Sequence, residues 1–127
     1  MAHDEAIQAA KSVMSAHIEA LNARDEDDLA ATLHFPHIRL SQTDLRVWDT
    51  PESYFADFRA RAGSRWARSS FDDMRVAQSS DTKVHIETTV RRFDGADTEI
   101  GSFRSLWVIT RENGRWAAKL RSSFAET

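Results

Sequence analysis

The sequence predicts an α+β fold, in which helical segments come first and a meander of long antiparallel strands follows. Apolar residues recur at helical spacing over residues 4–22, whereas from about residue 70 they alternate with polar residues. Near the end, Asn113-Gly114 separates two strand-like runs and is the strongest short-range signal for a two-residue hairpin loop. The 127 residues and 41% hydrophobic content suit one domain covering residues 1–127.

Three helices are predicted before the long strands. The first covers residues 4–22. A short second helix should begin after Asp25, because aspartate is a favoured N-cap residue and acidic residues follow it in the first turn. This helix should end before Pro36. The third should begin at Pro51, because proline is favoured at the first helical position, and end at Gly63.

Two short and four long strands complete the prediction. They are expected at residues 37–41, 45–48, 71–79, 83–93, 98–111 and 115–124. The register of 71–79 stays open, because Met74 and Val76 alternate against Phe71 and Ala77 and a change of one residue would exchange the two sets.

The Asn113-Gly114 turn fixes the pairing of the last two strands. It places Trp107 opposite Leu120 and Ser105 opposite Ser122. Opposed residues share a face, so one face should cover the core. Its predicted members are Phe103, Trp107, Ile109, Trp116, Leu120 and Phe124.

The opposite, outward face of this sheet mixes aliphatic and charged residues. Leu106 and Val108 lie among polar neighbours there, a composition that favours a subunit interface. The expected contact is a homodimer through the outer sheet face. Its predicted members are Glu87, Arg104, Leu106, Val108 and Arg121.

The composition excludes several classes of function. The chain carries 17 basic and 20 acidic residues, both interspersed, so no basic stripe is available for nucleic acid. It has no cysteine, which excludes a disulfide scaffold and a thiol nucleophile. No apolar run approaches the roughly 18 residues of a membrane span, and no secretory signal is visible, so we expect a cytoplasmic protein.

The order of elements resembles the nuclear transport factor 2-like superfamily, and within it the SnoaL-like domains. The resemblance covers nearly the whole chain. It is carried by the segments LNARDEDDLAATLHFPHIRL (21–40), WDTPESYFADF (48–58) and LWVITRENGRWAAKLRSSF (106–124).

The resemblance implies a cone-shaped fold, the cystatin-like roll, in which a curved antiparallel sheet wraps around three N-terminal helices. Such domains leave a pocket at the wide end of the cone and commonly dimerise through the outer sheet face. The superfamily holds isomerases, dehydratases, cyclases, epoxide hydrolases and binding modules, so the fold does not select one activity.

Aromatic and small polar residues are candidates for lining such a pocket. Large rings supply apolar walls, and hydroxyl or imidazole groups supply polar anchors. The ligand-binding candidates are His17, Tyr54, Trp66, Ser105, Trp107 and Ser122. A small apolar or aromatic ligand is the expected partner.

Three residues are candidates for acid–base chemistry, namely His34, His37 and Asp73. Histidine titrates near neutral pH, and one carboxylate of the Asp72-Asp73 pair must face inward from a strand. The ketosteroid isomerase mechanism does not carry over, because residues 37–42 contain no Asp or Glu and the first helix has no tyrosine. The histidine spacing matches no metal motif, and no cofactor is expected.

Two functional interpretations remain open besides a purely protein-binding adaptor, which would have a filled cone and an exposed apolar patch outside the dimer contact. The first is a small-molecule-binding domain with an apolar pocket. The alternative is a cofactor-free enzyme of the isomerase, dehydratase or cyclase type that uses a pocket histidine and an aspartate as its acid–base pair. The enzyme requires two titratable groups that converge at the pocket, whereas the binding domain requires only the cavity.

Overall fold

The computed structural model describes residues 3–61, 63 and 65–126. Three helices and six strands make up the described chain. In order they are α1 (Asp4–Ala23), α2 (Glu26–Ala30), β1 (Leu33–Ser41), β2 (Asp44–Trp48), α3 (Pro51–Arg61), β3 (Arg68–Ser79), β4 (Lys83–Phe93), β5 (Glu99–Glu112) and β6 (Arg115–Ser123).

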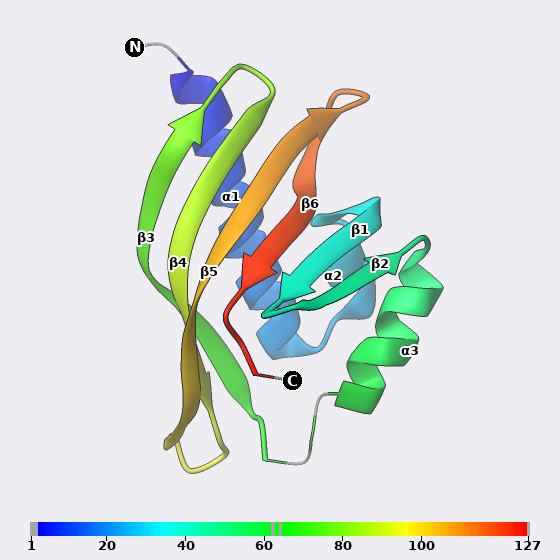
Figure 1. Cartoon of the computed structure of the whole chain (residues 1–127), viewed down its shortest axis with the longest axis vertical. Helices are drawn as coiled ribbons and strands as arrows, with labels where there is room; N and C mark the ends of the chain where they lie inside the picture. The colour runs from blue at the N-terminus through cyan, green and yellow to red at the C-terminus, as the bar shows by residue number, and fades with distance from the viewer. Residues whose placement is uncertain (1–2, 62, 64, 127) are drawn as a thin grey trace.

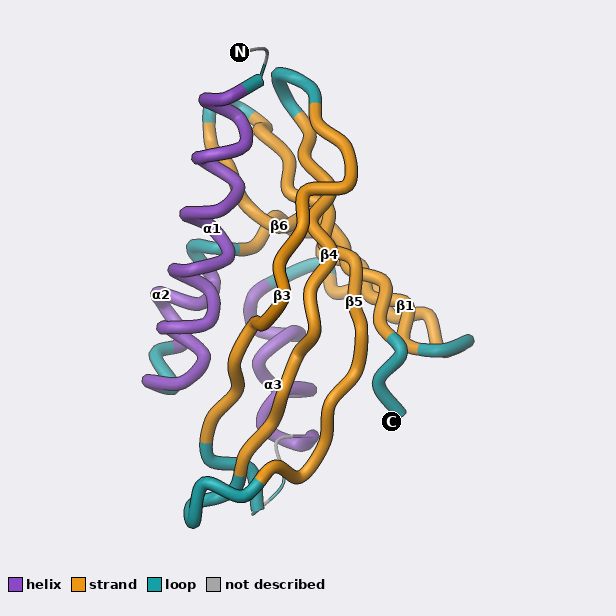
Figure 2. Tube along the Cα trace, turned by 90° about the vertical axis from the view of Figure 1, so that its left-hand side faces the viewer, coloured by secondary structure: helices purple, strands orange, loops and turns teal. Residues whose placement is uncertain are grey.

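The six strands form one sheet in the order β2-β1-β6-β5-β4-β3. All neighbouring pairs are antiparallel except β1 and β6, which are parallel. Figures 1 and 2 show the sheet strongly bent, with α1 along one side of it and α3 beside β2. The α+β fold class and the curved sheet over N-terminal helices are confirmed. None of the described helices is long and apolar enough to span a membrane.

The helix starts follow the capping signals in the sequence. The Asp25 side chain accepts a hydrogen bond of 3.0 Å from the Asp28 backbone N–H and so caps α2. At α3, the Thr50 hydroxyl accepts from the Ser53 N–H at 3.2 Å, and Pro51 is the first helical residue. Both predicted starts are confirmed.

β1 begins earlier than the sequence predicts. Residues 33–36 were expected to end a helix, yet they belong to β1, so His34 is a strand residue. The cause is the parallel pairing of Leu33 with Ala118 in β6, where the Ala118 N–H donates to the Thr32 carbonyl at 2.8 Å. This partner lies far away in the sequence, and no local pattern reveals it.

The concave face of the sheet forms the core with α1. Val84, Ile86 and Thr88 in β4 are buried. Their cross-strand partners in β5 lie on the same face of the sheet and are Ile109, Trp107 and Ser105. The helix contributes Ala10 and Met14, which are fully buried against this face.

β6 contains an irregularity that changes the predicted face of its second half. Ile109 pairs with Ala118 as expected, but Val108 pairs with Leu120, so Lys119 is an extra residue in β6. Trp107 is therefore opposite Arg121 rather than Leu120. Leu120 shares the outward face with Val108, and the assignment of Leu120 to the core face is wrong.

The same displacement affects the end of β6. Ser105 pairs with Ser123, not with the predicted Ser122, and Ser122 turns to the outward face opposite Leu106. Phe124 lies beyond the strand with 65% of its surface exposed, so its core assignment is also wrong.

β3 resolves its open register by breaking the alternation. The pairing with β4 shifts between Asp72 and Arg75, and Asp73 adopts a left-handed backbone with φ 53°. Because of the shift, both Phe71 and Val76 pack against the core. Met74 is 43% exposed.

Candidate functional site

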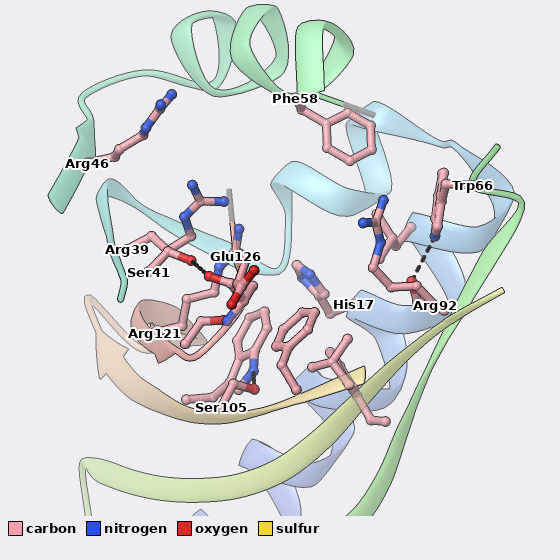
Figure 3. A pocket seen from close by; sticks show the side chains of 18 of the residues that line it. His17, Arg39, Ser41, Arg46, Phe58, Trp66, Arg92, Ser105, Arg121 and Glu126 are labelled. Atoms are coloured by element: carbon pink, nitrogen blue, oxygen red, sulfur yellow. Dashed lines mark hydrogen bonds between the residues drawn. The ribbon is translucent and has the colours of Figure 1, made fainter. Parts of the chain in front are cut away.

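A cavity of about 590 Å³ lies between the concave face of the sheet, α1 and α3 (Figure 3). This size is typical of small-molecule sites. Six aromatic residues contribute to its wall, namely Tyr54, Phe58, Trp66, Phe71, Phe103 and Trp107. The polar lining residues include His17, Ser41, Ser69, Ser105, Ser123 and four arginines, Arg39, Arg46, Arg92 and Arg121.

Two serines hold the indole rings of the wall. The Trp107 Nε1–H donates to the Ser105 Oγ at 3.0 Å, and the Trp66 Nε1–H donates to the Ser69 Oγ at 2.8 Å. A buried indole N–H needs such a partner. With this requirement met inside the wall, the rings line the cavity as apolar surfaces.

Arg121 enters the cavity because of the extra residue in β6. Its Cζ lies 5.0 Å from the centre of the Trp107 ring and 5.9 Å from that of Tyr54. An Arg121 Nη2–H donates to the Tyr54 hydroxyl at 3.4 Å. The prediction that Arg121 belongs to the outer face is therefore wrong, because that register did not include the bulge.

Arg39 in β1 is the direct neighbour of Arg121 across the β1–β6 pair. It is 7% exposed, and its Cζ lies 5.6 Å from the centre of the Trp48 ring. Two residues further along each strand, Ser41 pairs with Ser123 on the same face, and both residues line the cavity. β1 and β6 thus add a polar strip to the cavity wall.

His17 places a hydrogen-bond acceptor in the cavity wall. The Thr32 hydroxyl donates its proton to the Leu29 carbonyl at 2.7 Å, so it can only accept from His17 Nδ1, which lies 2.8 Å away. The proton is therefore on Nδ1, and Nε2 carries a lone pair. No other described residue hydrogen-bonds to the His17 ring, which lines the cavity beside Trp107 (Figure 3).

The environment keeps His17 neutral. Burial, and after it the charges of Arg121 and His37, hold the pKa of His17 well below its usual value of 6.5. A neutral imidazole with a free Nε2 can accept a hydrogen bond or take up a proton from a bound molecule.

His37 lies behind the cavity wall rather than in it. Its ring stacks on Trp48 and meets Tyr54 edge-on, and its Nδ1–H donates to the Ala118 carbonyl at 3.0 Å. Burial, followed by the charge of Arg121, lowers the pKa of His37 to about 3. Nε2 is buried and has no hydrogen-bond partner among the described residues.

The structure does not bring the other two catalytic candidates to the cavity. His34 Nε2 donates to the Thr110 carbonyl at 2.9 Å, away from the lining, because β1 begins at Leu33. Asp73 is exposed at the bulge of β3. Its neighbour Asp72 pairs with Arg91 at 2.9 Å, so neither carboxylate faces inward as predicted.

Most of the ligand-binding candidates do line the cavity. His17, Tyr54, Trp66, Ser105 and Trp107 are all in its wall, whereas Ser122 is not and Ser123 takes its place. The arginines of the lining were not among the predicted ligand-binding residues. Arg39 had a readable signal, since Arg39 and Ser41 share the face of His37 in a strand.

In the part of the chain that the structure describes, no group of three or more His, Asp or Glu side chains could hold a metal ion. The lining contains a single described carboxylate, that of Glu126. The arrangement can therefore enclose an organic molecule against aromatic rings and present guanidinium, hydroxyl and imidazole groups to it.

Comparisons with known proteins identify the fold. No protein-family model matches the chain, and no curated protein does. Among solved structures, a cystatin-like protein of unknown function from Nostoc punctiforme has a TM-score of 0.76 at 16% identity, covering 91% of this chain and 87% of its own. Aln2 from a Streptomyces species has a TM-score of 0.71 at 20% identity, covering 94% and 90%.

A proposed polyketide cyclase from Xanthomonas campestris pv. campestris gives a TM-score of 0.62 at 20% identity, covering 94% of this chain and 91% of its own. Other similar structures are named as nuclear transport factor 2-like proteins of unknown function. The chain therefore has the nuclear transport factor 2-like, or cystatin-like, fold.

The two buried histidines should make the protein less stable in acid. Below pH 6.5 the unfolded chain binds protons on His17 and His37 that the folded chain excludes, so the free energy of unfolding falls as the pH falls. Each histidine contributes a slope that approaches about 1.4 kcal/mol per pH unit. Urea unfolding at several pH values between about 5 and 6.5 measures the slope.

The variant His37→Asn keeps an N–H donor for the Ala118 carbonyl but cannot titrate, so it should remove the His37 share of this slope. An unfolding free energy of the wild type that does not change over this range would contradict the assignment of both histidines as neutral.

Proposed function

We propose that this chain is a small-molecule-binding domain that encloses an apolar or aromatic ligand in the cavity. The observation that carries the proposal is the cavity of about 590 Å³ with six aromatic residues in its wall. A cavity of this size and composition buries most of the surface of a ligand with one to three rings. The likeness to a proposed polyketide cyclase is consistent with such a use of the fold.

The histidine and aspartate that the enzyme interpretation requires as an acid–base pair do not line the cavity. His34 and Asp73 lie away from the lining, and His37 lies behind Tyr54. His17 is the histidine that lines the cavity, and no aspartate of the described residues accompanies it there. We therefore rest the proposal on binding and assign no reaction.

The neutral fluorescent probe N-phenyl-1-naphthylamine should bind with saturable enhancement and one site per chain. The variant Val90→Phe adds a ring where Val90 lines the cavity. It should weaken binding about 10-fold, equivalent to leaving roughly 55 Å² of apolar ligand surface unburied at about 25 cal/mol per Å². Fluorescence titration of both proteins measures the change.

The matched control is Ala77→Phe, which adds the same ring at an exposed position of β3. It should bind the probe like the wild type. Equal binding by the Val90→Phe variant, or no saturable binding by the wild type, would contradict the proposed cavity function.

We also propose that two copies of the chain associate through the outward face of the sheet. Cross-strand pairs join the side chains of this face in two rows. The first row is aliphatic and runs from Val47 through Ile38 and Leu120 to Val108, and the second runs from Leu45 through Leu40 to Ser122 and Leu106. Leu40, Leu45 and Val47 are at least 40% exposed. A largely aliphatic patch of this kind, interrupted by Ser122 alone among these paired positions, is typical of a subunit contact.

The chemistry of this face favours a second copy of the same chain as the partner. The centre of the patch is uncharged, and charged residues border it on β4 and β5. Glu87 lies opposite Leu106 and pairs with Arg75, and Arg104 donates to the Thr89 hydroxyl. An apolar centre with a polar rim can match itself across a two-fold axis.

The variant Leu120→Glu should dissociate this dimer. It introduces a charge at the centre of the patch, which costs about 3 kcal/mol or more when buried without a partner and weakens association by roughly 100-fold. Sedimentation velocity over a range of concentrations measures the effect. The control Met74→Glu, on the opposite edge strand β3, should sediment like the wild type, and a monomeric wild type would refute the proposed dimer.

A further inference from the structure

His17 uses only one of its two ring nitrogens within the described chain. The residue is 2% exposed, and its ring lies in the wall of the cavity (Figure 3). Nδ1 donates to the Thr32 hydroxyl at 2.8 Å, and Nε2 has no hydrogen-bond partner among the described residues. A molecule in the cavity can reach this nitrogen, whereas the Nε2 of His37 is buried behind the wall.

The surroundings of Thr32 prevent the two nitrogens of His17 from exchanging their roles. The Thr32 and Leu29 oxygens lie 2.7 Å apart, and only the Thr32 hydroxyl can supply the proton between them. An imidazole with its proton on Nε2 would then direct two lone pairs at each other across the 2.8 Å contact. Burial, the largest cause, holds the pKa of His17 well below 6.5, so the ring does not carry both protons at neutral pH. Nε2 is therefore a fixed hydrogen-bond acceptor.

This acceptor lies among apolar rings. The Phe71 ring is nearly parallel to the imidazole at 6.1 Å between centres, and the Trp107 ring meets it edge-on at 4.9 Å. Both rings line the cavity, as does Leu21, which is one turn further along α1. The Trp107 indole N–H is not available as a donor, because it already donates to the Ser105 hydroxyl at 3.0 Å. The donor for Nε2 must come from water or from a bound ligand.

The position of Nε2 restricts the chemistry of the ligand. A purely apolar ligand would displace water from Nε2 and leave a buried acceptor without a donor, which weakens binding. A hydroxyl group attached directly to an aromatic ring avoids this loss. It brings the donor and an apolar surface to the same place, where the acceptor and the surrounding rings meet both requirements.

We propose that the ligand of the cavity is a phenol, whose ring hydroxyl donates to His17 Nε2 while its ring packs against Phe71 and Trp107. This inference rests on the proposed binding function and names the class of ligand for the same cavity. Thr32 acts as a positioning residue, because it fixes the proton on Nδ1 and does not itself line the cavity.

The first test compares 2-naphthol, which is neutral at neutral pH, with 2-fluoronaphthalene, which has nearly the same shape and no donor. Equilibrium dialysis measures the affinity of each compound. The ratio of the two affinities should be about 10-fold higher in the wild type than in the variant His17→Phe, which keeps a ring but has no acceptor. The variant Thr32→Val, which no longer fixes the tautomer, should also lower this ratio.

The matched control is His3→Phe. It makes the same substitution at a histidine that contacts Asp81 at 2.8 Å and does not line the cavity. This variant should keep the wild-type ratio.

The second test uses the wild type alone and is decisive even when His17→Phe does not fold. Nitrogen-15 NMR of the His17 imidazole should show a protonated Nδ1 and an unprotonated Nε2. Saturation with 2-naphthol should move the Nε2 signal towards that of a hydrogen-bonded nitrogen, and saturation with 2-fluoronaphthalene should not. In Thr32→Val, part of the proton should move from Nδ1 to Nε2, which a purely structural role of Thr32 would not cause.

Each outcome has a separate meaning. A protonated Nε2 in the free wild type, or an Nε2 signal that bound 2-naphthol does not move, would overturn the phenol inference and leave the cavity function standing. The same affinity ratio in the wild type and in His17→Phe would do so as well. An unchanged tautomer in Thr32→Val would overturn the role of Thr32. Binding of neither compound would refute the cavity function itself, together with the inference that rests on it.

Discussion

One extra residue in β6 determines the character of the cavity. Lys119 interrupts the pairing with β5, so that every later residue of β6 faces the side opposite to the one that regular pairing gives it. Leu120 leaves the core for the outward face, and Arg121 and Ser123 enter the cavity. A regular strand would line this wall with leucine and would place Arg121 outside. The apolar outer face and the charged inner wall therefore have the same structural origin.

The cavity combines a rigid aromatic wall with a polar strip at one side. Ser105 and Ser69 satisfy the indole N–H groups of the wall, so its rings need no polar partner from a ligand. Further polar groups of the wall come from β1 and β6, whose parallel pairing puts Arg39 next to Arg121. His17 adds a neutral acceptor, and its tautomer follows from the single proton of the Thr32 hydroxyl. Apolar, cationic and acceptor groups thus surround one space.

The sequence predicts the fold class, the helix starts and the presence of the long strands, because capping residues and the period of two are local signals. It also identifies five residues of the cavity wall, from His17 to Trp107. Features that depend on partners distant in the chain could not be predicted from local patterns. The early start of β1 follows from pairing with β6, and the bulges at Lys119 and Asp73 leave no mark on the alternation of residues. Each bulge moved a predicted site residue, Ser122 or Asp73, out of the cavity.

The most direct test of this account is the environment of Arg121 and Leu120 in solution, measured by nuclear Overhauser effects in the folded wild type. The bulged register predicts contacts from the Arg121 side-chain methylene groups to the Trp107 indole, and from the Leu120 methyl groups to Val108. A regular register, without the extra residue, would place the Leu120 methyl groups against the Trp107 indole and the Arg121 side chain on the outward face. Contacts between the Leu120 methyl groups and the Trp107 indole would contradict the account, because Arg121 would then lie outside the cavity.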